Sequence, residues 1–183
     1  MNKSTTLDDV LNFWFSERVK PLWFKKSDEF DRKIKQRFLD TYQLAKTGEL
    51  TSWRERSVDL LSLIIILDQF PRNMFRNTAQ AFATDAQAVA LTKYALSHNY
   101  PQKLTIEQQI FLYMPLMHSE NKADQALSVE LFQELGKEDN LDFAIKHQAV
   151  IDRFGRFLHR NQILSRESTQ AEAEFLTQPG SSF

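Results

Sequence analysis

The stretch LLSLIIILDQFPRNMFR, residues 60–76, decides the fold of this chain. Seven of its first eight residues are apolar, so a helix here is apolar nearly all round and belongs at the centre of a helical protein. Pro71 predicts that this helix ends just after Asp68, because proline lacks the N–H that a continuing helix needs. A buried carboxylate at the negative end of a helix needs a cationic partner. Arg72 and Arg76 are the nearest candidates, and we interpret them as a structural ion pair with Asp68.

The rest of the chain predicts an all-α protein with a single domain over residues 1–183. Its 42% of apolar residues can build a sizeable core, and four glycines are too few for sheets joined by tight turns. Capping-box patterns begin at Ser52, Thr84, Thr105 and Thr169. We expect about eight helices in stacked antiparallel hairpins, because the connections are short. Their expected ranges are 6–16, 27–46, 52–69, 80–98, 105–118, 122–135, 140–160 and 168–177.

A second apolar helix, residues 110–117, is also followed directly by polar residues. It is followed by His118, Ser119 and Glu120, with Asp124 soon after. A His-x-Glu pair is a weak signal for a metal site without a third ligand at fixed spacing. We therefore favour a capping or structural use, and the sequence predicts no metal and no cofactor.

A third segment, residues 146–166, carries five basic groups and one acidic group. On a continuous helix over 140–160, Arg153, Arg156 and Arg160 share one arc, while His147 falls on the apolar arc and is expected to be a hydrogen-bonded core residue. Arginine forks suit carboxylates and phosphates. An anion site and structural pairing of these arginines with Asp68, Asp85, Glu120 or Asp124 are equally supported.

Several functional classes are excluded or disfavoured. The chain has no cysteine, so it has no disulfide and no thiolate metal site. The net charge of −1 offers no global field for nucleic acid or an anionic membrane, so neither is expected as a partner. P-loop, Rossmann, G-x-S-x-G and H-E-x-x-H patterns are absent. No secretory signal or membrane-spanning run is evident, and we expect a cytoplasmic protein.

The unusual segments together resemble a known bacterial family. They are residues 11–15, 67–76, 111–120, 153–161 and the ending Pro179–Phe183, and the resemblance is to the family named domain of unknown function 924. It implies an all-α, tetratricopeptide-repeat-like superhelix of helical hairpins and supplies no function. Leu158 stands where the family pattern has Pro, and Ser165 where Gly is expected. If the backbone follows the family there, His159 and Arg160 do not continue the preceding helix.

Three hypotheses of function follow. The first is a binding module for a carboxylate- or phosphate-bearing metabolite or peptide, held near Asp68 by Arg72, Arg76, Arg153, Arg156 and Arg160, with the Phe183 carboxylate as a mimic of the ligand. The second is an enzyme of unassigned class in which His118 or His159 is the acid or base and Glu120 or Asp124 orients it. The third is a protein-interaction scaffold with an exposed aromatic patch of Trp14, Trp23 and Phe24.

Overall fold

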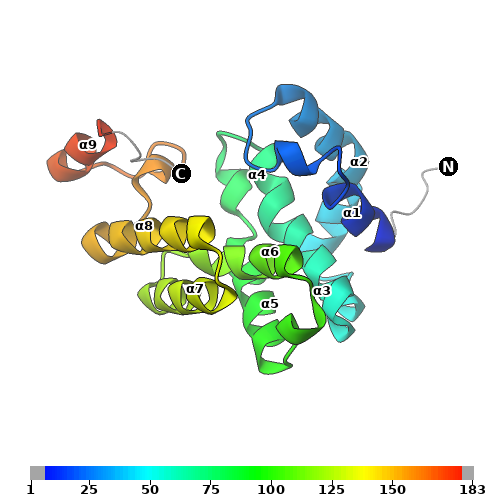
Figure 1. The fold of residues 1–183 in the computed structure, drawn as a ribbon. Helices are drawn as coiled ribbons and strands as arrows, with labels where there is room; N and C mark the ends of the chain where they lie inside the picture. Colours follow the sequence, from blue (N-terminus) through cyan, green and yellow to red (C-terminus); the bar gives the residue numbers. More distant parts are fainter. Residues whose placement is uncertain (1–6, 179–183) are drawn as a thin grey trace. The chain divides into compact units, whose positions relative to one another are not determined.

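The computed structural model describes residues 7–178, and this range is helical without a strand (Figure 1). The predicted all-α class is therefore confirmed. The α-helices are α1 (Leu7–Trp14), α2 (Asp28–Thr47), α3 (Ser57–Ile64), α4 (Phe70–Met74), α5 (Asp85–Ser97), α6 (Ile106–Met117), α7 (Lys122–Leu135), α8 (Glu138–Phe154) and α9 (Gln170–Leu176). Single turns of 3₁₀-helix connect them at Lys20–Leu22, Thr51–Glu55, Ala79–Phe82, Pro101–Lys103 and Leu158–Arg160. Among the described residues, no helix has both the length and the apolar character needed to cross a bilayer.

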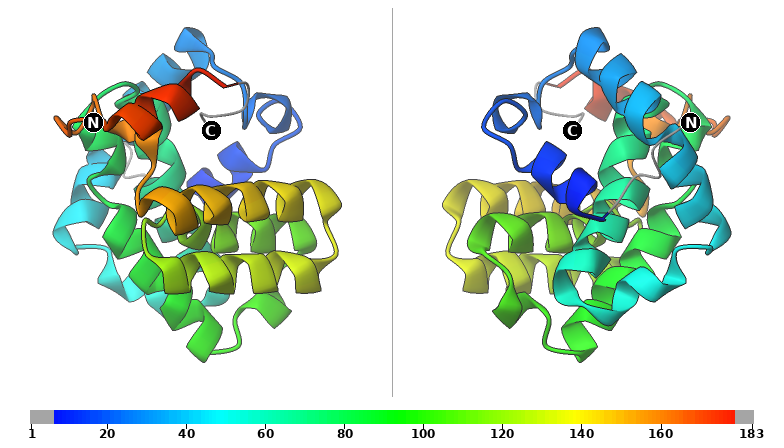
Figure 2. Two further views of the ribbon diagram at one scale, coloured as in Figure 1. Left: turned by 90° about the vertical axis from the view of Figure 1, so that its left-hand side faces the viewer. Right: turned by 90° about the vertical axis from the view of Figure 1, so that its right-hand side faces the viewer.

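The chain forms two compact units. Of the described residues, the first contains 7–76 and 80–115, and the second contains 77–79 and 116–178. Within the second unit, α7 and α8 lie side by side as an antiparallel hairpin, which both views of Figure 2 show. The hairpin turns at Gly136, whose φ of 67° is the left-handed conformation that ends α7.

The first unit is built around the predicted apolar helix. Leu60, Leu61, Ile64, Ile65 and Ile66 are completely buried. Aromatic rings pack beside them: the Trp14 and Phe70 centroids are 5.6 Å apart, and the Phe38 and Phe70 centroids are 4.7 Å apart. The prediction that residues 60–67 form a central helix is confirmed.

The prediction that this helix stops after Asp68 is wrong. After α3 the chain makes a π-helical turn at Ile65–Gln69, in which the Phe70 N–H donates to the Ile65 carbonyl. It then continues into α4, with Pro71 in the first turn, where a missing N–H costs least. The Leu67 carbonyl, four residues before Pro71, instead accepts a bond from the buried Thr84 hydroxyl at 2.5 Å.

Of the four predicted capping boxes, two are present and two are wrong. Thr105 makes reciprocal bonds with Gln108, and Thr169 makes a complete capping box with Glu172. The Ser52 box is wrong, because Thr51–Glu55 is a 3₁₀ turn before α3 begins. The Thr84 box is wrong too, because that hydroxyl bonds Leu67 and makes no cap bond.

The expected continuous helix over 140–160 is also wrong. α8 ends at Phe154, and Gly155 follows with a φ of 71°, which favours glycine and redirects the chain. Phe157 is extended, and Leu158–Arg160 is a separate 3₁₀ turn. His159 and Arg160 therefore do not continue α8. This is the outcome expected if the backbone follows the family despite Leu158. Ser165 adopts the left-handed conformation, with a φ of 54°, where a glycine was expected.

Replacing Thr84 by Val tests the contact that allows the central helix to pass Pro71. T84V leaves the Leu67 carbonyl buried without its donor, and we expect the free energy of unfolding to fall by about 1–3 kcal/mol in urea denaturation. T47V is the matched control, since the Thr47 hydroxyl also bonds helix carbonyls but is exposed. Equal stability of the two variants would contradict this role for Thr84.

Candidate functional site

In the first unit, Asp68 and Arg72 form the predicted structural ion pair. Asp68 is completely buried in the π-helical turn, and its Oδ1 lies 3.3 Å from Arg72 Nη1. Arg72 also donates to both carboxylate oxygens of Asp85, at 2.9 and 3.0 Å. Burial lowers the pKa of Arg72, but Asp68 and Asp85 outweigh it and raise that pKa above its ordinary value. Arg72 is therefore charged and held between two carboxylates.

Arg76 is engaged in the same unit by a different carboxylate. Its Nε and Nη2 donate to the two oxygens of Asp31 at 2.7 and 2.9 Å, and Asn73 donates to Asp31 at 2.8 Å. The bond to Asp31 raises the pKa of Arg76. This carboxylate comes from α2 and was not among the partners expected from the sequence.

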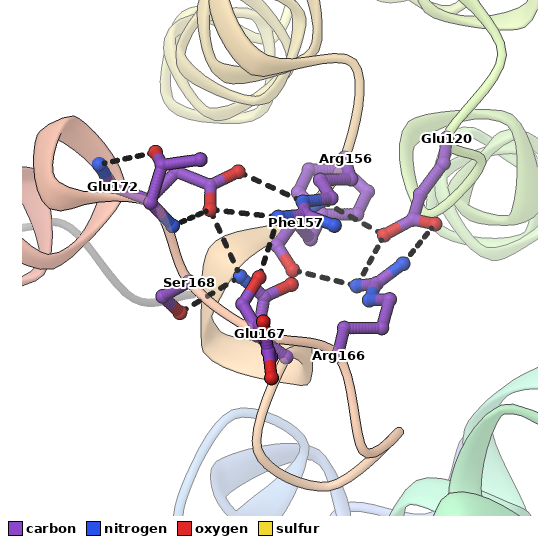
Figure 3. Close-up of polar contacts among 9 residues, drawn as sticks. Glu120, Arg156, Phe157, Arg166, Glu167, Ser168 and Glu172 are labelled. Atoms are coloured by element: carbon purple, nitrogen blue, oxygen red, sulfur yellow. Dashed lines mark hydrogen bonds and ion pairs between the residues drawn. The ribbon is translucent and has the colours of Figure 1, made fainter.

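In the second unit, Arg156 binds the carboxylate of Glu172 at the start of α9 (Figure 3). Its Nε and Nη2 donate to the two oxygens of Glu172 at 2.8 and 2.7 Å, and Nη2 also donates to the Glu167 carbonyl at 2.8 Å. The bond from Arg156 lowers the pKa of Glu172 from 4.5 to about 2. Arg153 behaves differently: it is exposed, and its guanidinium lies over the rings of Phe154 and Phe175.

Glu120 is held by a residue that the sequence analysis did not single out. Arg166 donates to both of its carboxylate oxygens at 2.8 and 3.0 Å, and the Phe157 N–H donates to Oε1 at 2.8 Å (Figure 3). Burial raises the pKa of Glu120, but these bonds outweigh it and lower that pKa overall. Glu120 therefore remains ionised and serves to position the chain around Phe157.

Arg160 lies in a group of histidines that we call the His–Arg cluster: His118, His147, His159 and Arg160. Arg160 is buried, and its Nη2 donates to the His118 carbonyl at 2.9 Å. Its guanidinium lies 4.7 Å from the centre of the Phe157 ring. The same ring is 5.4 Å from the His147 ring and 5.8 Å from the His159 ring. The His118 and His147 rings are 6.4 Å apart.

His147 is the neutral member of the cluster. Its Nδ1 is 2.8 Å from the Phe143 carbonyl, which makes this nitrogen the donor and fixes the tautomer. Burial lowers its pKa from 6.5 to about 3, electrostatic interactions with His118, His159 and Arg160 act in the same direction, and the bond to the Phe143 carbonyl opposes them. The predicted hydrogen-bonded core role of His147 is confirmed. His118 and His159, in contrast, are only half-buried and reach the surface.

The cluster forms because the helix breaks at Gly155, so sequence analysis on a continuous helix could not bring His147 and His159 together. Gly155, together with the proline that the family pattern has at position 158, was the available signal. Within residues 7–178, no three histidine or carboxylate side chains are grouped so that they could hold a metal ion. The suggested ligand mimic at Phe183 lies outside the described residues.

Comparison with known proteins gives the family and no activity. The model of the family described as bacterial protein of unknown function, DUF924, matches residues 10–180. The chain is similar to the solved structure of a protein of unknown function from Agrobacterium tumefaciens, with 38% sequence identity and a TM-score of 0.88. That match covers 93% of this chain and 96% of the other. No curated protein matches this chain.

Replacing Glu172 by Gln tests the ion pair with Arg156. We expect E172Q to lose about 1–3 kcal/mol of unfolding free energy, less than for a fully buried pair, because the Arg156 side chain is 28% exposed. Glu172 has a lowered pKa in the folded state, so its contribution is complete above pH 4.5 and is lost as the pH falls towards about 2.

Urea denaturation across this pH range measures both effects. Wild type should lose stability on acidification more steeply than E172Q. E174Q is the matched control, since Glu174 lies on the same helix and is exposed. An acid profile of E172Q that overlays that of wild type would contradict the assignment.

Proposed function

The chain belongs to the bacterial family of unknown function DUF924, and we propose that it binds a carboxylate- or phosphate-bearing metabolite or peptide at the His–Arg cluster. The observation that carries the proposal is the convergence of two imidazoles and one guanidinium around Phe157 in the second unit, with the His118 ring 6.4 Å from that of His147. Groups of this kind attract anions, and arginine is the side chain best suited to carboxylate and phosphate.

The electrostatics of the cluster support an anionic ligand. Arg160 brings a positive charge to the surroundings of His147, and this charge is among the causes of the lowered pKa of that imidazole, of which burial is the largest. Burial disfavours a positive charge on His147, whereas the permanent charge of Arg160 favours an anion beside it. The imidazoles of His118 and His159 are half-buried, so a ligand can reach them from solution.

The other predicted ligand-binding residues are less suited to this role. Three of these arginines are already in bidentate ion pairs within their own unit: Arg72 with Asp85, Arg76 with Asp31, and Arg156 with Glu172. An external anion would have to displace that carboxylate and leave it unpaired, which is costly for a buried group such as Glu172. The proposal places the ligand at Arg160 with His118 and His159 because the His159 ring and the Arg160 guanidinium lie beside the same Phe157 ring.

The acid–base alternative has less support than the binding function. It used Glu120 or Asp124 to orient His118, but Glu120 is held by Arg166 and by the Phe157 N–H. Asp124 is buried at the start of α7 and accepts a bond from the Ser119 hydroxyl at 2.7 Å.

The cytoplasmic location and the tetratricopeptide-repeat-like stacking expected from the sequence also belong to the proposal.

A thermal-shift series with phosphate, pyrophosphate, citrate and a glutamate-rich peptide tests the proposal, with chloride at equal ionic strength as the reference. An anion at a hundred times its dissociation constant stabilises the folded state by about 2.7 kcal/mol, which raises Tm by roughly 5–10 °C for a chain of this length. We expect H159Q to weaken binding by about tenfold in titration calorimetry, because the contact of the imidazole with the anion is lost.

The fourth histidine supplies the matched control. His98 is exposed in the first unit, where its ring stacks on Tyr94, so H98Q should bind the anion as wild type does. Equal loss of binding in H98Q and H159Q, or the absence of any anion-specific rise in Tm, would overturn the proposal.

A further inference from the structure

The first unit presents an aromatic side chain to solvent at a turn. Phe24 is 71% exposed, the highest value among the exposed large apolar side chains of the described residues. It lies between the 3₁₀ turn at Lys20–Leu22 and the start of α2. A single exposed apolar side chain is ordinary on a protein surface, so the surroundings of Phe24 decide whether it has a role beyond folding.

Phe24 rests on a rigid base of other aromatic rings. It stacks on the buried Phe111 at 6.4 Å, with the ring planes 9° apart. The neighbouring Trp23 lies 4.7 Å from Phe111 and 5.7 Å from Phe15. Trp23 and Phe15 are half-buried, so Phe15, Trp23 and Phe24 form a surface that we call the aromatic platform.

The platform is held in place before any partner arrives. The Trp23 indole N–H donates to the Trp14 carbonyl at 2.9 Å, and Trp14 is completely buried. A fixed aromatic surface loses little conformational entropy on binding, which is why aromatic side chains so often anchor protein interfaces. The predicted aromatic patch is thus present for Trp23 and Phe24, whereas Trp14 lies in the core and not in the patch.

The charges beside the platform define the partner. Lys25 and Lys26 follow Phe24 directly and are exposed, and neither is in an ion pair with a described residue. Lys20, in contrast, is neutralised by Glu17 and Glu107 at 3.1 and 3.0 Å. An apolar tip beside two available ammonium groups is complementary to an apolar side chain beside carboxylates.

We propose that the aromatic platform docks an acidic segment of a partner protein, whose apolar side chain packs against Phe24 and whose carboxylates pair with Lys25 and Lys26. A peptide suits this surface better than an anionic lipid bilayer does. Asp28 and Glu29 lie exposed in the first turn of α2, immediately after the two lysines. A uniformly anionic surface is repelled by them, whereas a peptide can place its carboxylates over the lysines alone.

Fluorescence anisotropy of a labelled polyglutamate peptide with one central phenylalanine tests this surface on the full chain, and H159Q, measured in parallel, should keep the binding that belongs to the platform and not to the His–Arg cluster. We expect salt-sensitive binding, and about tenfold weaker binding when serine replaces the central phenylalanine of the peptide. F24S in the protein should produce a similar loss. Because Phe24 is exposed, F24S should keep the Tm of wild type. The double variant K25E/K26E should also lose binding.

The matched control is F143S, which removes another phenylalanine that is 51% exposed beside a lysine, in the second unit. It should bind the peptide as wild type does. Equal affinity of F24S and F143S, or no binding of the peptide by wild type, would overturn the proposal. Binding to anionic vesicles in preference to the peptide would assign the platform to a lipid surface. A dimer in sedimentation velocity that F24S abolishes would assign it to a second copy of the chain.

Discussion

The carbonyl oxygens near the ends of the two apolar helices need hydrogen-bond donors, and much of the polar structure follows from this requirement. A buried carbonyl without a donor costs as much as a lost hydrogen bond. Pro71 removes the donor that Leu67 would otherwise receive, and the buried Thr84 supplies a replacement. Arg72 donates similarly to the Asp68 carbonyl at 2.7 Å. The polar residues after the first apolar helix are therefore needed for it to continue through a proline.

The same requirement operates at the end of α6. Gln125 is completely buried, and its side-chain amide donates to the carbonyls of Leu116, Met117 and Ser119. Arg160 takes the remaining carbonyl of this turn, that of His118. A cation at the negative end of a helix is also favoured by the helix dipole. Capping thus brings a buried guanidinium beside His118, and the His–Arg cluster arises from a structural need.

Local rules predicted what depends on local contacts. The pairing of Asp68 with Arg72 spans four residues, and the capping box at Thr169 spans three, so both could be predicted from spacing. The π-helical turn at Ile65–Gln69 could not, because it depends on Thr84, seventeen residues later. The partner of Glu120 is Arg166, forty-six residues away, and no local sequence pattern predicts such a pair.

In the candidate site, too, local spacing alone did not predict the contacts that each arginine makes. Arg153, Arg156 and Arg160 share one arc only if the helix continues, and Gly155 separates them. Arg153 then covers aromatic rings at the surface, Arg156 is neutralised by Glu172, and Arg160 enters the interior beside the histidines. Three arginines of similar spacing thus have three different electrostatic roles. An excess of arginine in a sequence therefore does not identify an anion site by itself, because an internal carboxylate such as Glu172 can already hold the guanidinium.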